Sequence, residues 1–170
     1  MTKLICFVAF FMIVTGERCN CQMNIEPIRN FELNKYLGKW YEIARLPASF
    51  EKDLVNVTAT YSLMNNGKVK VENEGINKDN KKNKKAIGNA KFGAAQNIGY
   101  LRVSFFWPFY GDYKILKLDK DYKYALVFSS RKLMWILSRE KTMEKGILDQ
   151  YLSASKEIGI ETTKLIYSQE

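Results

Sequence analysis

The chain has 170 residues, of which 46% are hydrophobic and 26% are charged, a size and composition typical of one globular domain with a substantial core. Its formal net charge of +9 at pH 7 favours anionic partners such as phosphate head groups, acidic lipid surfaces or nucleic acid. The absence of histidine excludes Ser-His-Asp and Cys-His catalysis, histidine-ligated haem and most zinc sites, so neither a metal nor a cofactor is predicted.

The N-terminus has the pattern of an export signal. One lysine precedes an apolar run over residues 4–14, and two small residues follow it, as in segments cleaved by signal peptidase. The run is too short to favour a membrane-spanning helix, and an uncleaved N-terminal anchor is the alternative. We predict a signal peptide over residues 1–16 and a polar lead-in over residues 17–30.

The three cysteines, Cys6, Cys19 and Cys21, all lie in this N-terminal part. No disulfide can therefore link distant parts of the folded domain, as it does in many small secreted proteins. Cys19 and Cys21 are candidates for the lipidated first residue of a lipoprotein, although their neighbours Arg18 and Asn20 suit that processing poorly. Both a lipid-anchored and a soluble exported form stay open.

The first predicted strand covers about residues 39–45 and presents two different faces. Alternation places Trp40, Glu42 and Ala44 on one face and Tyr41, Ile43 and Arg45 on the other. A second strand follows over about residues 57–63, and Asn65-Asn66-Gly67 predicts a tight hairpin. The return strand carries Val69 and Val71, so the first three strands form a meander.

Residues 76–85 hold five lysines and almost no apolar side chains, which predicts a loop. An aromatic segment over residues 105–111 is also predicted as a loop, because Pro108 and Gly111 interrupt it. The remaining strands are predicted over about residues 87–92, 101–105, 113–118, 124–128 and 133–139. About eight short strands without intervening helices favour an antiparallel sandwich or a closed up-and-down barrel.

Helical spacing of apolar residues appears only near the C-terminus, between residues 142 and 158. Thr142 can cap the start of this helix, and Gly159 suits its end. A last apolar patch over residues 165–167 predicts one more short strand. Neither an internal repeat nor a long linker divides the chain.

Three motifs in chain order carry a resemblance to a known family: Gly38-Lys39-Trp40-Tyr41, Leu118-Asp119 with Tyr122 before Ala125-Leu126-Val127, and Leu137-Ser138-Arg139. They resemble the three signature regions of the lipocalins. The segments W-Y-E-I-A-R and W-I-L-S-R most resemble the sequences of the bacterial outer-membrane lipocalins and their animal relative apolipoprotein D. The resemblance implies a lipocalin domain over residues 31–170.

This resemblance implies an all-β fold, an eight-stranded antiparallel up-and-down barrel with a C-terminal α-helix packed outside and a short final strand. It also implies that Gly38, Trp40 and Arg139 are structural. Trp40 would plug the closed end of the barrel with Arg139 across its indole, a contact of about 0.5 to 2 kcal/mol. The chain departs from many lipocalins in lacking barrel disulfides.

An eight-stranded barrel leaves an interior wide enough for one small ligand. The residues expected to face inward with Trp40 and to line this cavity are Ala59, Tyr61, Val71, Ala90, Phe92, Val103, Tyr113, Tyr124 and Trp135. Without the resemblance, inward aromatic residues are more often plain core than ligand contacts. A single bulge would also reverse the facing of a strand.

If the strands alternate in direction from the closed end, the connections over residues 46–56, 76–86, 106–112 and 129–132 meet at the open mouth. They bring together basic and aromatic side chains, of which we expect these to contact a head group: Lys81, Lys82, Lys84, Lys85, Arg131, Phe106 and Trp107. A cationic rim above an apolar interior suits a fatty acid or a lysophospholipid. The alternatives are a solvated basic loop and an aromatic loop that packs on its own barrel or joins a homodimer.

The sequence therefore predicts an exported lipid-binding protein without enzymatic activity, which stores or transports lipid at the cell envelope. We expect it in the outer membrane or periplasm, in contact with a membrane surface and not with nucleic acid. One alternative is an enzyme acting on a small lipophilic substrate in the same cavity, although the barrel lacks the cysteine or histidine that known enzymatic relatives use. The other is a nucleic-acid binder, which the export signal disfavours.

Overall fold

The computed structural model describes residues 25–169. The predicted signal peptide over residues 1–16, most of the lead-in, and the candidate lipidation sites Cys19 and Cys21 lie outside the described residues. The described elements are α1 (Leu33–Tyr36), β1 (Gly38–Arg45), η1 (Ser49–Glu51), β2 (Leu54–Leu63), β3 (Val69–Asn77), β4 (Asn83–Phe92), β5 (Tyr100–Phe106), β6 (Phe109–Leu118), β7 (Tyr124–Ser130), β8 (Leu133–Ser138), α2 (Lys145–Glu157), η2 (Thr162–Lys164) and β9 (Ile166–Tyr167).

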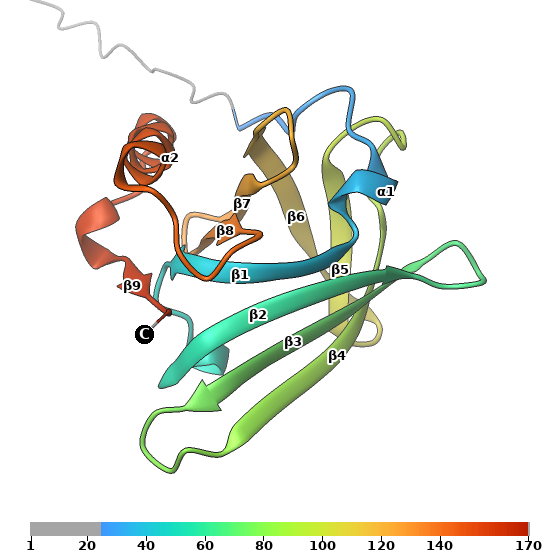
Figure 1. Cartoon of the computed structure of the whole chain (residues 1–170). Coiled ribbons are helices and arrows are strands. Elements are labelled where there is room, and N and C mark those ends of the chain that lie inside the picture. The colour runs from blue at the N-terminus through green and yellow to red at the C-terminus, as the bar shows by residue number, and fades with distance from the viewer. Residues whose placement is uncertain (1–24, 170) are drawn as a thin grey trace, which may run out of the picture.

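Strands β1 to β8 form a closed antiparallel barrel, which confirms the predicted fold class (Figure 1). Each strand pairs with the next, and β1 pairs with both β8 and β2, so these eight strands leave no free edge among themselves. Closure of this kind removes the unpaired edges that promote aggregation. Strand β9 pairs with the last residues of β1 from outside the barrel, where the apolar patch at residues 165–167 predicted a strand.

Alternation along the strands separates two apolar clusters, one inside the barrel and one outside it. The outer cluster lies between β7, β8, the end of β1 and helix α2, which Figure 1 shows beside these strands and away from β2, β3 and β4. Tyr151 of α2 packs edge-on against Tyr124, with 6.4 Å between ring centroids. No helix among residues 25–169 has the length and apolar character needed to cross a bilayer.

The closed end of the barrel is built around Trp40, which is fully buried. Its indole nitrogen donates a hydrogen bond to the carbonyl of Tyr36 at 2.8 Å, and the guanidinium of Arg139 lies 3.9 Å from the ring centroid. Arg139 also donates to four backbone carbonyl groups from the residues around it. Gly38 has a φ of 95°, and a Cβ there would lie 3.3 Å from Arg139 Nη1. The structure thus shows the Trp40 and Arg139 contact that the resemblance implies.

Two segments predicted as loops are hairpins. Strand β3 runs to Asn77 and β4 begins at Asn83, so residues 76–85 comprise two strand ends and the turn between them. The neighbouring strand supplies acids to one of the lysines in this segment: Lys85 Nζ lies 2.8 Å from Glu72 and 3.1 Å from Glu74. The aromatic segment is also a hairpin, in which Phe106 pairs with Phe109 around a tight turn.

The facing predicted for the end of β1 is wrong at Arg45. The register of β1 against β8 shifts between Glu42 and Ala44, and this bulge returns Arg45 to the side of Glu42. Ala44, which we predicted to face inward, belongs to the outer cluster. The helix start is also corrected: α2 begins at Lys145 after Glu144, and Thr142 does not cap it.

Candidate functional site

The barrel encloses a cavity of about 1010 Å³ that opens at the end opposite Trp40. Strand direction places this opening where β1 ends and β2 begins, and where the β3–β4, β5–β6 and β7–β8 turns lie. Residues from all eight barrel strands contribute to the wall, β7 through Ser129 alone, together with the η1 segment. The volume is at the upper end of the range of about 300 to 1,000 Å³ that small-molecule sites occupy.

Most of the side chains predicted to line the cavity do so in the structure. Those that form its wall are Ala59, Tyr61, Val71, Val103, Tyr113 and Trp135. Ala90 and Phe92 face the same interior, but they pack in the inner cluster near the closed end instead of lining the open space. Their positions follow from pairing with Val69 and Leu101, which lie in the first two residues of strands that start at that end.

The prediction that Tyr124 lines the cavity is wrong. Ala125 and Val127 belong to the inner cluster, so alternation turns Tyr124 outward. There its ring packs against Tyr151, whose hydroxyl donates to the Tyr124 carbonyl at 2.9 Å. Both faces of β7 are buried, and hydropathy alone therefore could not distinguish inside from outside.

Three tyrosine hydroxyl groups meet at the inner end of the cavity. The hydroxyl of Tyr113 lies 2.7 Å from that of Tyr36 and 2.8 Å from that of Tyr61. Tyr61 and Tyr113 belong to the cavity wall, whereas Tyr36 lies beneath them in α1. Burial raises the pKa of each phenol, so all three stay neutral at physiological pH.

A charged cluster lies at the cavity wall near the mouth, where Glu42 and Glu51 line the cavity and Arg45 pairs with both. Arg45, Glu42 and Glu51 have side chains that are only 2%, 3% and 7% exposed. Arg45 Nη1 donates to Glu42 Oε1 at 2.6 Å, Nη2 donates to the Glu51 carbonyl at 2.8 Å, and Nε lies 3.6 Å from Glu51 Oε2. Trp135 Nε1 donates to the same carboxylate oxygen at 3.2 Å. These contacts hold the β1–β2 connection against β8.

Two carboxyl groups share one guanidinium in this cluster. The single positive charge cannot fully compensate two buried negative charges, and the pKa values of both acids are raised. The pKa of Glu51 is raised to about 7, mainly by burial and also by the neighbouring Glu42, against the opposing effects of Trp135 and Arg45. Burial also raises the pKa of Glu42, although Arg45 counteracts it. The cavity wall therefore carries a carboxyl group that can titrate near neutral pH.

Aromatic side chains surround the mouth and point into solvent. Phe106, Trp107 and Phe109 in the β5–β6 hairpin are 81%, 83% and 76% exposed, and Phe50 of η1 is 62% exposed. Such an exposed group of large apolar residues is uncommon on a monomeric soluble protein and marks an interaction surface. We call Phe106, Trp107 and Phe109 the aromatic hairpin.

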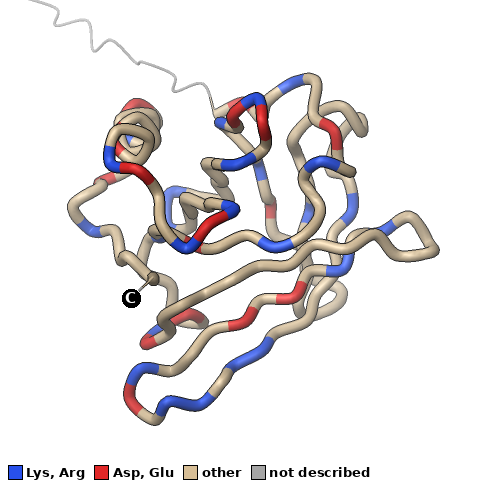
Figure 2. The backbone as a smooth tube through the Cα atoms, viewed as in Figure 1, with Lys and Arg blue, Asp and Glu red and all other residues tan. Residues whose placement is uncertain are grey.

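Basic residues lie around the same rim, as Figure 2 shows along β4 and its turn. Of the predicted head-group residues, Lys84, Lys85 and Phe106 line the cavity. Lys81, Lys82, Trp107 and Arg131 lie in or beside turns at this end without contributing to the cavity wall. Lys85 is engaged by Glu72 and Glu74, so it offers a ligand less free charge than its neighbour Lys84.

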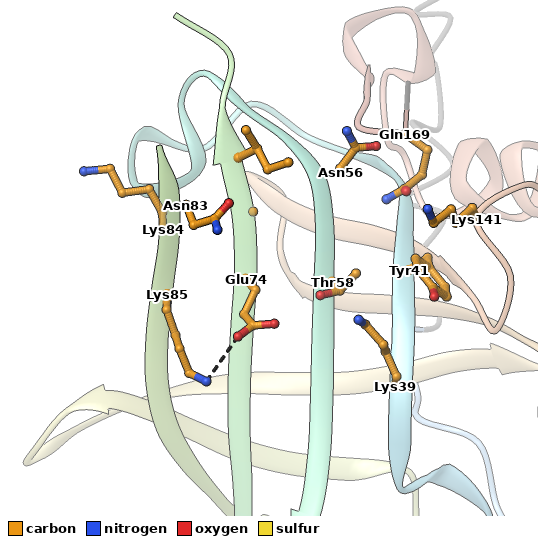
Figure 3. Close-up of a pocket in the computed structure, with 12 residues that line it drawn as sticks. Lys39, Tyr41, Asn56, Thr58, Glu74, Asn83, Lys84, Lys85, Lys141 and Gln169 are labelled. Carbon is orange, nitrogen blue, oxygen red and sulfur yellow. Dashed lines mark ion pairs between the residues drawn. The ribbon is translucent and has the colours of Figure 1, made fainter. Parts of the chain in front are cut away.

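A second, smaller hollow of about 520 Å³ lies on the outer surface of β1 to β4 (Figure 3). It is lined mainly by polar side chains: Lys39, Asn56, Thr58, Glu74, Asn83, Lys84, Lys85, Lys141 and Gln169. Such a lining offers little to an acyl chain. The barrel cavity is therefore the better candidate site, and residues 25–169 contain no group of acids or cysteines arranged to hold a metal ion.

The sequence analysis did not predict the polar roles of three residues at this site, Tyr36, Arg45 and Glu51. Tyr36 lies in a one-turn helix before the first strand, and Glu51 lies in a connection, so neither belongs to an alternating pattern. Arg45 was assigned to the wrong face. One signal was available: Glu42 shares the inward face of Trp40, and a carboxylate expected inside a barrel needs a cationic partner nearby.

Comparison with known proteins adds sequence relatives over most of the chain. A family model described as a lipocalin-like domain matches residues 31–170. The outer membrane lipoprotein Blc of Vibrio cholerae is 47% identical over 149 residues, covering 86% of this chain and 87% of the relative. The protein of the same name from Escherichia coli K12 is 38% identical over 163 residues, covering 95% and 92%. Apolipoprotein D of Cavia porcellus is 42% identical over 108 residues, covering 63% and 56%.

Solved structures share the fold at low sequence identity. Insecticyanin from the tobacco hornworm superimposes with a TM-score of 0.70 at 22% identity, covering 85% of this chain and 84% of that one. Apocrustacyanin A1 from lobster gives a TM-score of 0.65 at 19% identity, covering 81% and 78%. These two similarities concern the barrel architecture alone.

Proposed function

This chain belongs to the lipocalin family, and from that premise we propose that it holds the acyl chain of a fatty acid or lysophospholipid in its barrel. The observation that carries the proposal is the cavity of about 1010 Å³, with aliphatic and aromatic side chains in its wall and lysines at its rim. Each methylene group that leaves water for such an interior contributes about 0.8 kcal/mol. The rim attracts a phosphate or carboxylate that stays at the mouth.

We further propose that the protein is exported and works at the cell envelope, where it stores or transports lipid. The support is the export-signal pattern of residues 1–16 and the printed name of its bacterial relatives, outer membrane lipoprotein. A lipid anchor on Cys19 or Cys21 belongs to the same proposal. We propose that the role is one of binding and not of catalysis.

Filling the cavity tests the proposed function directly. Ala59 lines the cavity, and we expect Ala59→Trp to weaken fatty acid binding by about 100-fold, because excluding about four methylene groups costs about 3 kcal/mol. The measurement is the dissociation constant for hexadecanoic acid, obtained by titration calorimetry on protein freed of lipid.

Thr60→Trp is the matched control, since Thr60 is the next residue on β2 and alternation turns it to the outer face. We expect this variant to bind hexadecanoic acid like the original protein. Equal binding by both tryptophan variants would contradict a site inside the barrel, and the absence of acyl binding to the original protein would contradict the proposed function itself.

We propose that the aromatic hairpin contacts a membrane surface, so that lipid passes directly between the bilayer and the cavity mouth. Trp107 and Phe109 are exposed at the end of the barrel where the cavity opens. Aromatic side chains suit the interface between head groups and acyl chains, and the neighbouring lysines favour anionic lipids. Replacing both residues, as Trp107→Ser with Phe109→Ser, should weaken binding to phosphatidylglycerol vesicles by about tenfold or more.

Vesicle co-sedimentation measures this effect, and Leu63→Ser with Met64→Ser provides the control. Leu63 and Met64 are also exposed, but they lie at the β2–β3 turn on the closed end. Loss of vesicle binding in this control would mean that exposed apolar area in general drives binding. A protein that runs as a dimer and becomes monomeric on changing the hairpin would instead identify the hairpin as a contact between two copies.

A further inference from the structure

We infer that the floor of the cavity donates a hydrogen bond to a neutral oxygen atom on the innermost end of the ligand. The inference rests on the proposed function, since it concerns the lipid that the cavity holds. It concerns the three hydroxyl groups of Tyr36, Tyr61 and Tyr113, which we call the tyrosine floor. A ligand that suits this floor is an acyl chain with a ketone, ester or similar oxygen at the end farthest from its charged head group.

The hydrogen bonds of the tyrosine floor leave one hydrogen atom without an acceptor. Three phenol groups carry three hydrogen atoms, but only two contacts join them, at 2.7 Å between Tyr36 and Tyr113 and at 2.8 Å between Tyr61 and Tyr113. Within residues 25–169 these three hydroxyls have no further hydrogen-bond partner. Whichever way the two bonds point, one O–H group still has to find an acceptor.

The cavity is the place where that acceptor can sit. All three side chains are buried, so bulk water does not surround the hydroxyls. Tyr61 and Tyr113 form part of the cavity wall, and they come from opposite sides of the barrel, on β2 and β6. A buried donor without an acceptor costs about 1 to 3 kcal/mol, so a ligand oxygen that meets it binds better than a methyl group there.

The acceptor should be neutral. The three phenols stay protonated because burial raises the pKa of each, so they offer hydrogen bonds without positive charge. The guanidinium whose charge acts on Tyr36 and Tyr61, that of Arg139, is already occupied with the Trp40 ring and four backbone carbonyl groups. A carboxylate pushed to this depth would lose its hydration without gaining a cation, whereas a ketone oxygen would lose little and accept one bond.

The test compares a plain fatty acid with the acid of equal length that carries a ketone at the next-to-last carbon. A series of chain lengths lets the ketone reach the floor while the carboxylate stays at the mouth. At the best length we expect the ratio of dissociation constants, plain over ketone, to be about tenfold larger in the original protein than in the Tyr61→Phe, Tyr113→Phe double variant. That variant removes both hydroxyls of the cavity wall and keeps both rings.

Tyr36→Phe is the matched control, because it leaves two hydroxyls, one hydrogen bond between them and one spare hydrogen on a cavity-lining residue. It should therefore keep the preference for the ketone. Thermal unfolding of each variant shows whether the fold is intact. Binding of the plain acid shows whether the cavity still accepts an acyl chain, so a change confined to the tyrosine floor can be recognised.

An unchanged ratio in the double variant, or a preference for the plain acid at every length in the original protein, would overturn the inference and indicate that water meets the spare hydrogen. In both cases binding of the plain acid would leave the proposed function standing. If neither acid binds, the proposed function fails and the inference fails with it.

Discussion

Replacing Arg45 with methionine is expected to lower the free energy of unfolding by about 3 to 5 kcal/mol. The change would leave the carboxylates of Glu42 and Glu51 facing each other in the cavity wall without their shared cation. It would also remove the hydrogen bonds that Arg45 donates to the carbonyl groups of Glu51 and Leu54. Urea unfolding at pH 8 measures the loss. At this pH a buried carboxyl without a cation is destabilising whether it stays ionised or takes up a proton.

A second substitution distinguishes lost pairing from lost packing. Adding Glu42→Leu to Arg45→Met removes one of the two uncompensated acids, and we expect it to restore part of the stability, because neutral side chains of similar size replace a buried ion pair at little cost. Lys39→Met, on the exposed outer face of the same strand, should change the free energy of unfolding by less than about 0.5 kcal/mol. A small loss in Arg45→Met with no recovery in the double variant would show that water reaches the cluster.

The stability of the protein should fall as the pH rises from about 4.5 to about 7. Burial raises the pKa of Glu51 from 4.5 to about 7, so in this interval the folded state holds a proton that the unfolded state has released. Its contribution is fully present below pH 4.5 and is lost as the pH passes 7, and the whole change is about 3 kcal/mol. Glu42 acts in the same direction, since burial also raises its pKa.

Glu51→Gln isolates this effect, because the amide oxygen can still accept the hydrogen bond from Trp135. In this variant, the free energy of unfolding should depend much less on pH between 4.5 and 7. Carboxyl groups whose pKa is lowered, such as Glu72 beside Lys70 and Lys85, lose their contribution only below about pH 4.5, outside that window. Equal slopes for Glu51→Gln and the original protein would contradict the buried position of Glu51.

Much of the fold could be predicted from the sequence because barrels repeat a simple pattern. Alternation and turn residues indicated eight strands in order, and the signature motifs added the closed end at Trp40 and Arg139. Composition failed at Lys85, which looks like a loop residue until β3 provides Glu72 and Glu74 beside it. The partner strand, and not the segment itself, decides whether such lysines can lie in a sheet.

The interior was harder to predict than the architecture, for two physical reasons. A bulge at the end of β1 changed the face on which the Arg45 side chain lies. Both faces of β7 are buried, so hydropathy did not indicate which way Tyr124 points. Some polar groups of the site also come from segments without an alternating hydrophobic pattern. Tyr36 lies in α1 and Glu51 lies in η1. Apolar wall positions follow from strand geometry, whereas polar contacts depend on how separate segments meet in three dimensions.

The outer cluster beneath α2 bears on the proposed role in lipid transport. A protein in that role would load and release lipid repeatedly, and its barrel would have to persist with nothing inside it. Strands β7, β8 and the end of β1 bury a second apolar face against α2, independent of the cavity contents. This packing stabilises one side of the barrel wall whether the cavity is full or empty. Release of a bound lipid would therefore not require the barrel to unfold.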